Sequence, residues 1–279
     1  MPEDDLSLEE LEGLSYYDFM GYMDVPFFNI GGVASIDRLA ELCRIGENSR
    51  VLMVGCGTGG NSCYLAQTYG CHMIGIDVAE HMIQKAQRRA EELELTDRVS
   101  FQLGDAYNLE FRPESFDVVF TVFVSQFLDK ERAFPEFVRV LEPEGYLGIN
   151  EMYKADEIPP EAIDSVREGE QVFHELTELP FNLNSPTEWR RAFEAATLID
   201  IVVEEYSGFG QQGTSLKMIN EFGGWVKLIK TLGRMLLLAA KSKKIRSRFG
   251  KISRGKRLLL RDEVATEYIG YILVVGKKS

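Results

Sequence analysis

The 279-residue sequence predicts an α/β fold, in which a Rossmann-like, doubly wound sheet of seven strands carries a helical cap and a basic insertion before the last strand. Three observations support this fold class. Residues 51–59 (VLMVGCGTG) form an apolar run that breaks into a glycine turn, as a buried strand does before a helix. Strand-like and helix-like patterns then alternate up to residue 150, which favours a parallel sheet. Two late strand patterns are separated by a basic segment.

The predicted strands are short runs rich in Val, Ile, Leu and Phe. The run 116–124 is almost continuously apolar and therefore suits a buried central strand. Residues 142–145 (EPEG) predict a turn just before the fifth strand. In chain order, the predicted strands are 50–54, 71–76, 99–103, 116–124, 146–150, 199–206 and 268–275.

The predicted helices carry apolar residues at helical spacing, or begin with capping residues. The helix over 187–196, for example, has Ser185 or Thr187 as its cap and Pro186 near its start. In chain order, the predicted helices cover 35–43, 61–69, 80–93, 130–141, 159–179, 187–196 and 225–241.

The chain divides into four predicted segments. Residues 1–30 are expected to form an N-terminal cap segment, in which 1–13 is a frayed acidic leader and 15–30 is rich in aromatic residues. Residues 31–208 form the core, with a cap helix around 159–179. Residues 209–262 are a basic helical insertion, and residues 263–279 return to the core as its final strand.

Composition narrows the class of protein. No apolar stretch reaches the roughly 18–20 residues needed to span a bilayer. The acidic N-terminus is the opposite of the start of a signal peptide. The four cysteines, Cys43, Cys56, Cys63 and Cys71, are too few for a disulfide framework and form no C-x-x-C pair. We therefore expect a cytoplasmic location and no metal.

The charge is unevenly distributed. The net charge is −13, yet residues 209–262 contain fourteen Lys or Arg and only two acids. Between 225 and 241 the apolar and basic residues fall on different helical faces. One interpretation is a lid helix packed on the core. The other is an interfacial helix that places residues 225–257 on an anionic membrane surface. Nucleic-acid contact is disfavoured, because aromatic residues are sparse in this segment.

The glycine turn at residues 55–60 indicates a nucleotide-type cofactor. Glycine permits a tight turn and close backbone approach to a ligand. Asp77 follows the next strand, about 20 residues further on, where a carboxylate accepts hydrogen bonds from a ribose. Because Gly55, Gly57 and Gly60 also fit the G-x-G-x-x-G pattern of dinucleotide sites, the turn alone does not choose the cofactor.

Several motifs in order resemble the class I S-adenosylmethionine-dependent methyltransferases, especially their small-molecule "type 11" group. The resemblance covers residues 30–155 and 186–206 and the final strand. It implies S-adenosylmethionine as cofactor and direct transfer of its methyl group. The motifs that carry it are the glycine loop, IGID at 74–77, GDA at 104–106, FDVV at 116–119 and VLEPEGYL at 140–147.

The resemblance also implies roles for individual residues. Tyr16 and Tyr17 of the aromatic segment either touch the cofactor or lie on the surface of the cap. Met53 departs from the family, which has an acidic residue two positions before the first glycine. The residues implied to contact S-adenosylmethionine are Gly55, Cys56, Gly57 and Gly59 at its methionine end, Asp77 at the ribose, Val78, Met82, Asp105 and Ala106 at the adenine, and Thr121 and Val122 at the sulfonium.

The methyl acceptor is expected to be a small molecule, with a lipid or an isoprenoid- or quinone-like compound as the finer expectation. Residues 122–127 (VFVSQF) lack the N-P-P-Y-like motif of enzymes that methylate nitrogen in DNA or protein. His174, in the extra helix, is the candidate general base. The alternatives are a methyltransferase of RNA or another macromolecule, and a non-catalytic cofactor-binding or membrane-recruited module. The methylated atom and the oligomeric state stay open.

Overall fold

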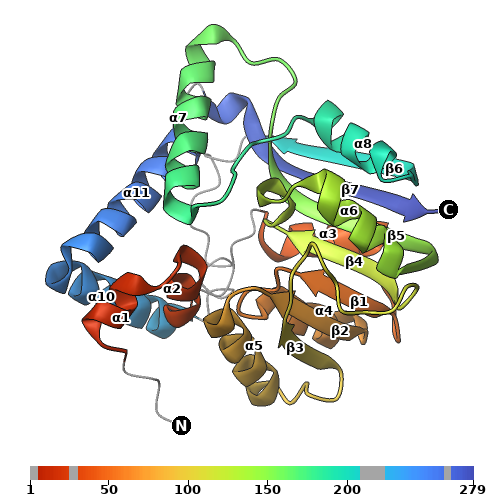
Figure 1. Ribbon diagram of the computed structural model, residues 1–279, viewed down its shortest axis with the longest axis horizontal. Helices are drawn as coiled ribbons and strands as arrows, with labels where there is room; N and C mark the ends of the chain where they lie inside the picture. Colours follow the sequence, from red (N-terminus) through yellow and green to blue (C-terminus); the bar gives the residue numbers. More distant parts are fainter. Residues whose placement is uncertain (1–5, 25–30, 208–223, 261–264) are drawn as a thin grey trace.

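A computed structural model describes residues 6–24, 31–207, 224–260 and 265–279 (Figure 1). Its centre is a seven-stranded sheet in the order β3-β2-β1-β4-β5-β7-β6. The first five strands in this order are parallel, whereas β7 runs antiparallel to both of its neighbours. The predicted α/β fold class and the seven strands are confirmed. The strands are β1 (Arg50–Val54), β2 (His72–Asp77), β3 (Val99–Leu103), β4 (Phe116–Val122), β5 (Leu141–Lys154), β6 (Leu198–Ser207) and β7 (Ile269–Lys278).

The predicted helices are present within a few residues of their expected bounds, and the structure adds α1 and α2 at the N-terminus and α11 in the basic insertion. Short 3₁₀ turns, η1 (Ser125–Phe127) and η3 (Ala265–Glu267), lie after β4 and before β7. The α-helices are α1 (Leu8–Gly13), α2 (Tyr16–Tyr22), α3 (Gly32–Leu42), α4 (Gly60–Tyr69), α5 (Glu80–Glu92), α6 (Lys130–Val140), α7 (Pro160–Thr177), α8 (Pro186–Ala195), α10 (Gly224–Lys241) and α11 (Lys243–Leu260).

The sheet is covered on both faces, as the two-residue repeat of its strands requires. In β1, Val51 and Met53 face the core formed with α3, α4 and α5. Leu52 and Val54 face the core formed with α6 and α8. All four side chains are buried, which accounts for the continuous apolar run in the sequence.

The expectation of a frayed leader over residues 1–13 is wrong for the part that the structure describes. Leu8–Gly13 forms α1, and Ser7 and Glu10 cap its start with reciprocal hydrogen bonds. This S-x-x-E capping box stabilises a helix start even where the composition is acidic. Leu11 is buried in the cluster that joins α1 and α2 to α5, α10 and α11.

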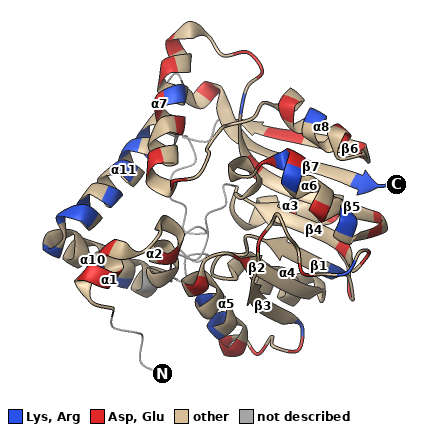
Figure 2. Ribbon diagram, in the orientation of Figure 1, with Lys and Arg blue, Asp and Glu red and all other residues tan. Residues whose placement is uncertain are grey.

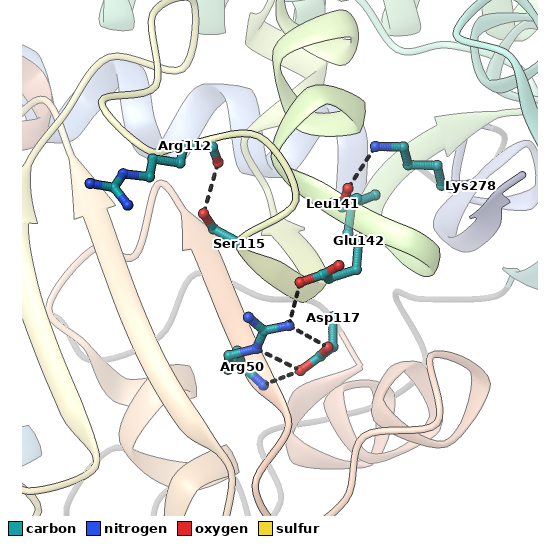
Figure 3. A network of polar contacts seen from close by, with 7 residues as sticks. All are labelled: Arg50, Arg112, Ser115, Asp117, Leu141, Glu142 and Lys278. Atoms are coloured by element: carbon teal, nitrogen blue, oxygen red, sulfur yellow. Dashed lines mark hydrogen bonds and ion pairs between the residues drawn. The ribbon is translucent and has the colours of Figure 1, made fainter.

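The turn predicted over residues 142–145 lies inside β5, where it forms a bulge in the strand. Phe116 pairs with Leu141, but Val118 already pairs with Tyr146, so the residues between them bulge out of the ladder. Beside this bulge, the Arg50 guanidinium donates to Asp117 (3.0 Å) and to Glu142 (2.8 Å), and the Lys278 amine donates to the Leu141 carbonyl (Figure 3). These contacts fasten the amino ends of β1, β4 and β5, at the edge opposite to the glycine loop.

The basic insertion connects the end of β6 to the start of β7, and these two points are neighbours in the sheet. Ser207 at the end of β6 pairs with Gly270 near the start of β7. In Figure 1 the helices α10 and α11 lie beside the sheet with α1, α2 and α7, forming a helical arm. The predicted segment boundaries at 30, 209 and 262 lie outside the described residues. Within the described residues, no helix combines the length and the apolarity needed to cross a membrane.

Candidate functional site

The glycine loop connects β1 to α4 and lies at the carboxyl edge of the sheet. Gly55, Gly57 and Gly59 have positive φ angles of 68°, 55° and 78°, a conformation that favours glycine. The backbone N–H of Cys56 donates to the Ile76 carbonyl (2.9 Å), which ties the loop to β2. A Cβ atom at Gly55 would lie 2.3 Å from Val124 Cγ2, whereas one at Gly57 would meet nothing within 4 Å. The loop is therefore closely packed at Gly55 and open at Gly57.

This difference gives a matched pair of variants. Gly55→Ala is expected to lower the free energy of unfolding by about 2–4 kcal/mol, because it adds overpacking against Val124 to a positive φ. Gly57→Ala carries the positive φ alone and is expected to cost about 1–2 kcal/mol. Urea unfolding followed by circular dichroism measures both. Equal losses for the two variants would contradict the packing of the loop against Val124.

Asp77 lies at the end of β2, facing the loop. Its Oδ2 accepts from the backbone N–H of Gly57 (2.9 Å), and its Oδ1 accepts from that of Ala79 (3.0 Å). Burial raises the pKa of this carboxyl, an effect that the backbone N–H donors oppose. Both carboxylate oxygens keep acceptor capacity, so Asp77 is fixed in position with room to accept further hydrogen bonds.

The short helix α2 covers this edge from the side of α5. Asp18 accepts from the backbone N–H of His81 (3.3 Å), and Gly21 lies so close to α5 that a Cβ there would be 2.8 Å from the Met82 nitrogen. Burial, followed by the neighbouring charges of Tyr16, Asp77 and Glu151, raises the pKa of Tyr17 well above its usual value. Its phenol therefore stays protonated.

Glu151 is a functional candidate that the sequence analysis missed. Its side chain is fully buried, and its Oε1 accepts from the backbone N–H groups of Val124 (2.9 Å) and Ser125 (2.7 Å) and from the Thr121 hydroxyl (3.2 Å). Its Oε2 has no hydrogen-bond partner among the described residues. Burial raises its pKa to about 7. A buried carboxyl oxygen without a partner is costly unless a ligand uses it.

A signal for Glu151 exists in the sequence. The fifth predicted strand is apolar from Tyr146 to Ile149, and Glu151 comes two residues later, before Met152 and Tyr153. The structure continues β5 to Lys154, so this carboxylate belongs to a buried strand and not to a loop after it. A charged residue inside a buried strand is rare enough to mark a candidate site.

Aromatic side chains from four separate segments form a row of adjoining rings, and one of them, Phe127, lies on η1, whose Ser125 backbone N–H donates to Glu151. Ring centroids are 6.0 Å apart for Tyr17 and Phe127, 5.2 Å for Phe127 and Phe181, and 5.0 Å for Phe181 and Phe173. These four residues, here called the aromatic row, come from α2, η1, the segment after α7, and α7 itself. An apolar wall next to buried carboxyl oxygens suits an acceptor that is largely apolar.

The structure places the other predicted cofactor residues at the same edge with different exposure. Thr121, Val122, Cys56 and Ala106 are buried, as is Met82. Val78 and Asp105 are exposed, and Asp105 accepts from the backbone N–H of Tyr107 (2.9 Å). Tyr16 is half-buried, with its ring edge-on to that of Tyr17.

The predicted general base lies elsewhere. His174 is exposed on α7, and its Nδ1 is 2.8 Å from the carbonyl oxygen of Leu179. This contact links the imidazole to the segment that follows α7. The catalytic role of His174 stays a prediction. In the described part of the chain, no group of three or more His, Cys, Asp or Glu is arranged to hold a metal ion.

Comparisons with known proteins agree with this geometry. The family described as "Methyltransferase domain" matches residues 51–145. A curated relative, the sterol 24-C-methyltransferase of Clavispora lusitaniae, is 34% identical over 119 residues, which are 42% of this chain and 32% of that protein. This chain thus spans about a third of the length of that relative.

Solved structures share the fold over nearly the whole chain. The [4+2]-cyclase SpnF has a TM-score of 0.68 and 20% identity, with 98% of this chain and 97% of that chain covered. The Haemonchus contortus phosphoethanolamine N-methyltransferase 2, solved with phosphomonomethylethanolamine and S-adenosylhomocysteine, has a TM-score of 0.67 and 21% identity, with 98% and 61% covered. At these identities the likeness establishes the fold.

Proposed function

We propose that the chain is an S-adenosylmethionine-dependent methyltransferase acting on a small molecule, since residues 51–145 match the family described as "Methyltransferase domain". The observation that carries this proposal is the carboxylate of Asp77, held 2.9 Å from the Gly57 nitrogen at the adjoining ends of β1 and β2. The open space in front of Gly57 fits a cofactor backbone there. When bound, S-adenosylmethionine supplies a methyl group on a positively charged sulfur.

Different residues of the site position the cofactor and the methyl acceptor. Asp77 accepts the ribose hydroxyls, with Gly55, Gly57 and Gly59 giving close backbone approach. Tyr17 covers the edge and excludes water, which strengthens the electrostatic interactions inside. Glu151 presents Oε2 to the polar group of the acceptor, or receives a proton from it. Transfer in a single displacement depends mainly on such orientation.

We propose an apolar, lipid- or isoprenoid-like acceptor. The aromatic row offers such a molecule an apolar wall beside Glu151. The similarity to a sterol 24-C-methyltransferase supports the same substrate class. Because acceptors of this kind reside in membranes, we propose that residues 225–257 meet an anionic membrane surface. A cytoplasmic location fits the four cysteines, all of which are free and buried.

A non-catalytic or differently catalytic protein is the second candidate. Met53 stands where the resemblance expects an acidic residue, and it is buried in the core between the sheet and α3, α4 and α5. The fold neighbour SpnF bears the name of a cyclase, so the fold does not dictate methyl transfer. Methyl transfer therefore requires a direct test.

Titration calorimetry with S-adenosylhomocysteine tests the cofactor, with NAD⁺ as the control for the dinucleotide alternative. We expect micromolar or tighter binding of the first, and none of the second. Transfer of labelled methyl from S-adenosylmethionine to vesicle-borne sterols, prenyl quinones and phosphoethanolamine then tests the acceptor class. Absence of S-adenosylhomocysteine binding would refute the function. Binding without transfer to any acceptor would favour the non-catalytic module.

A further inference from the structure

Helix α10 packs one face against α1 and α2 and leaves its most apolar face exposed. Thr231 and Leu238 are buried, with Leu238 in the cluster formed with α1 and α2. The guanidinium of Arg234 lies over the Tyr22 ring, 4.1 Å from its centroid, and donates to the Tyr22 carbonyl (3.4 Å). The packed face is therefore partly polar. A lid helix of the expected kind would instead have packed its apolar face on the core.

The opposite face of α10 exposes large apolar side chains. Trp225, Ile229 and Leu236 are 56%, 64% and 73% exposed. Their spacing, together with that of Leu232, places them along one side of the helix over three turns. Exposed apolar side chains gathered in this way mark an interaction site more often than a solvated surface. We call this set the apolar face; its members are Trp225, Val226, Ile229, Leu232, Leu236 and Leu237.

The charge around the apolar face is positive. Lys230 and Lys241 border it on α10, and Lys243 and Lys244 follow at the start of α11; all four are exposed. Neither α10 nor α11 contains an acidic residue, whereas α7 beside α11 carries several (Figure 2). Two further cations of α11 already pair with those acids, Lys251 with Glu175 and Arg254 with Glu168.

We propose that the apolar face of α10 docks in the headgroup region of an anionic phospholipid bilayer. An apolar stripe bordered by lysines is complementary to a surface with apolar chains beneath negative headgroups. At 18 residues, α10 is about 27 Å long and lies in the plane of the bilayer. Its apolar side chains enter the acyl boundary, and its lysines contact phosphate.

Docking at this face orients the candidate site. α10 then lies between the bilayer and α2, because Arg234 on its other face stacks on Tyr22 at the end of α2. α2 also carries Tyr17, the first member of the aromatic row. The bilayer therefore supports the helix that covers the carboxyl edge, and an apolar acceptor passes from the lipid to the aromatic row. This last step rests on the proposed function, whereas docking rests on the exposure and charge of α10 alone.

Trp225 provides a direct probe of docking. The sequence contains two tryptophans, and the other, Trp189, is fully buried in the core. Vesicles of phosphatidylcholine with phosphatidylserine are expected to shift the Trp225 emission to shorter wavelength, and brominated lipids to quench it. Vesicles of phosphatidylcholine alone should bind at least about tenfold more weakly, since the bordering lysines lose their anionic partners.

The variant Ile229→Glu/Leu236→Glu isolates the apolar face. We expect it to reduce vesicle flotation at least about tenfold, because binding scales with buried apolar area. The matched control is Ile199→Glu/Val202→Glu, which makes the same change at two exposed apolar residues of β6 and should float like the wild type. Titration with S-adenosylhomocysteine in the same variants separates docking from the proposed function, because it should be unchanged in both.

Three results would overturn the proposal. Equal flotation of the two double variants would remove the apolar face from any lipid contact. A dimer in light scattering that Ile229→Glu/Leu236→Glu dissociates, without flotation of the wild type, would assign the face to a second copy of the chain. Salt-sensitive RNA binding without vesicle binding would assign the basic border to nucleic acid.

Discussion

Asp77→Ala is expected to weaken S-adenosylhomocysteine binding about a hundredfold. The variant lacks the carboxylate that accepts hydrogen bonds from two ribose hydroxyls. Each hydrogen bond to a charged group contributes about 1.5 kcal/mol or more to the binding free energy. The backbone N–H groups of Gly57 and Ala79, which donate to Asp77 at 2.9 and 3.0 Å, would also lose their acceptor. Titration calorimetry measures the change in affinity.

The loss of affinity must be distinguished from a disordered loop. Asp77→Asn keeps the size of the side chain and one oxygen acceptor. Its affinity for S-adenosylhomocysteine should therefore lie between those of Asp77→Ala and the wild type. Asp105→Ala removes an exposed carboxylate implied to contact the adenine rather than the ribose, and should cost less than tenfold. An affinity that is unchanged in Asp77→Ala, with unfolding unaffected, would refute the ribose role.

Glu151→Gln is expected to remove a pH dependence of stability. The pKa of Glu151 is raised from 4.5 in the unfolded chain to about 7, mainly by burial. The folded protein therefore binds a proton more tightly than the unfolded chain, and this contribution is present below pH 4.5 and lost as the pH rises through 7. The difference in unfolding free energy between wild type and Glu151→Gln should fall by about 3 kcal/mol over that range.

Urea unfolding at several pH values measures this difference. The control is Glu47→Gln, which makes the same substitution at an exposed residue before β1. In a methyl-transfer assay, kcat/KM of the wild type should show an apparent pKa near 7 that Glu151→Gln lacks. A constant stability difference for Glu151→Gln would mean that the carboxyl is not buried as the structure has it.

The sheet was predictable because its signals are local. β1 and β3 have the predicted bounds, since a buried strand needs an apolar run and the residues that end it are polar or glycine. At α1 the acidic composition of residues 1–13 predicts a frayed segment, but the capping pair of Ser7 and Glu10 starts a helix there. The local pattern also ends the fifth strand at Asn150, although β5 continues to Lys154 along its antiparallel partner β7.

Of the candidate site, the glycine loop and its contact with Asp77 were predictable from the sequence. The glycine loop and Asp77 are linked by a spacing of about 20 residues that the sequence displays directly. The aromatic row depends on contacts between Tyr17, Phe127 and Phe181, which are far apart in the chain and lack any common period. The period of α10 likewise identified an apolar face but not which side of the helix would pack against the protein.

The pairing of Ser207 with Gly270 brings the two ends of the insertion that contains α10 and α11 next to each other. Because β6 and β7 are adjacent antiparallel strands, a tight hairpin turn at this point would close the sheet without the sixty or so residues between them. The entropy of closing a loop grows only slowly with its length, so segments of many sizes can be grafted at one hairpin with little change in the stability of the sheet. The size of this insertion can therefore change without altering the strand order of the sheet.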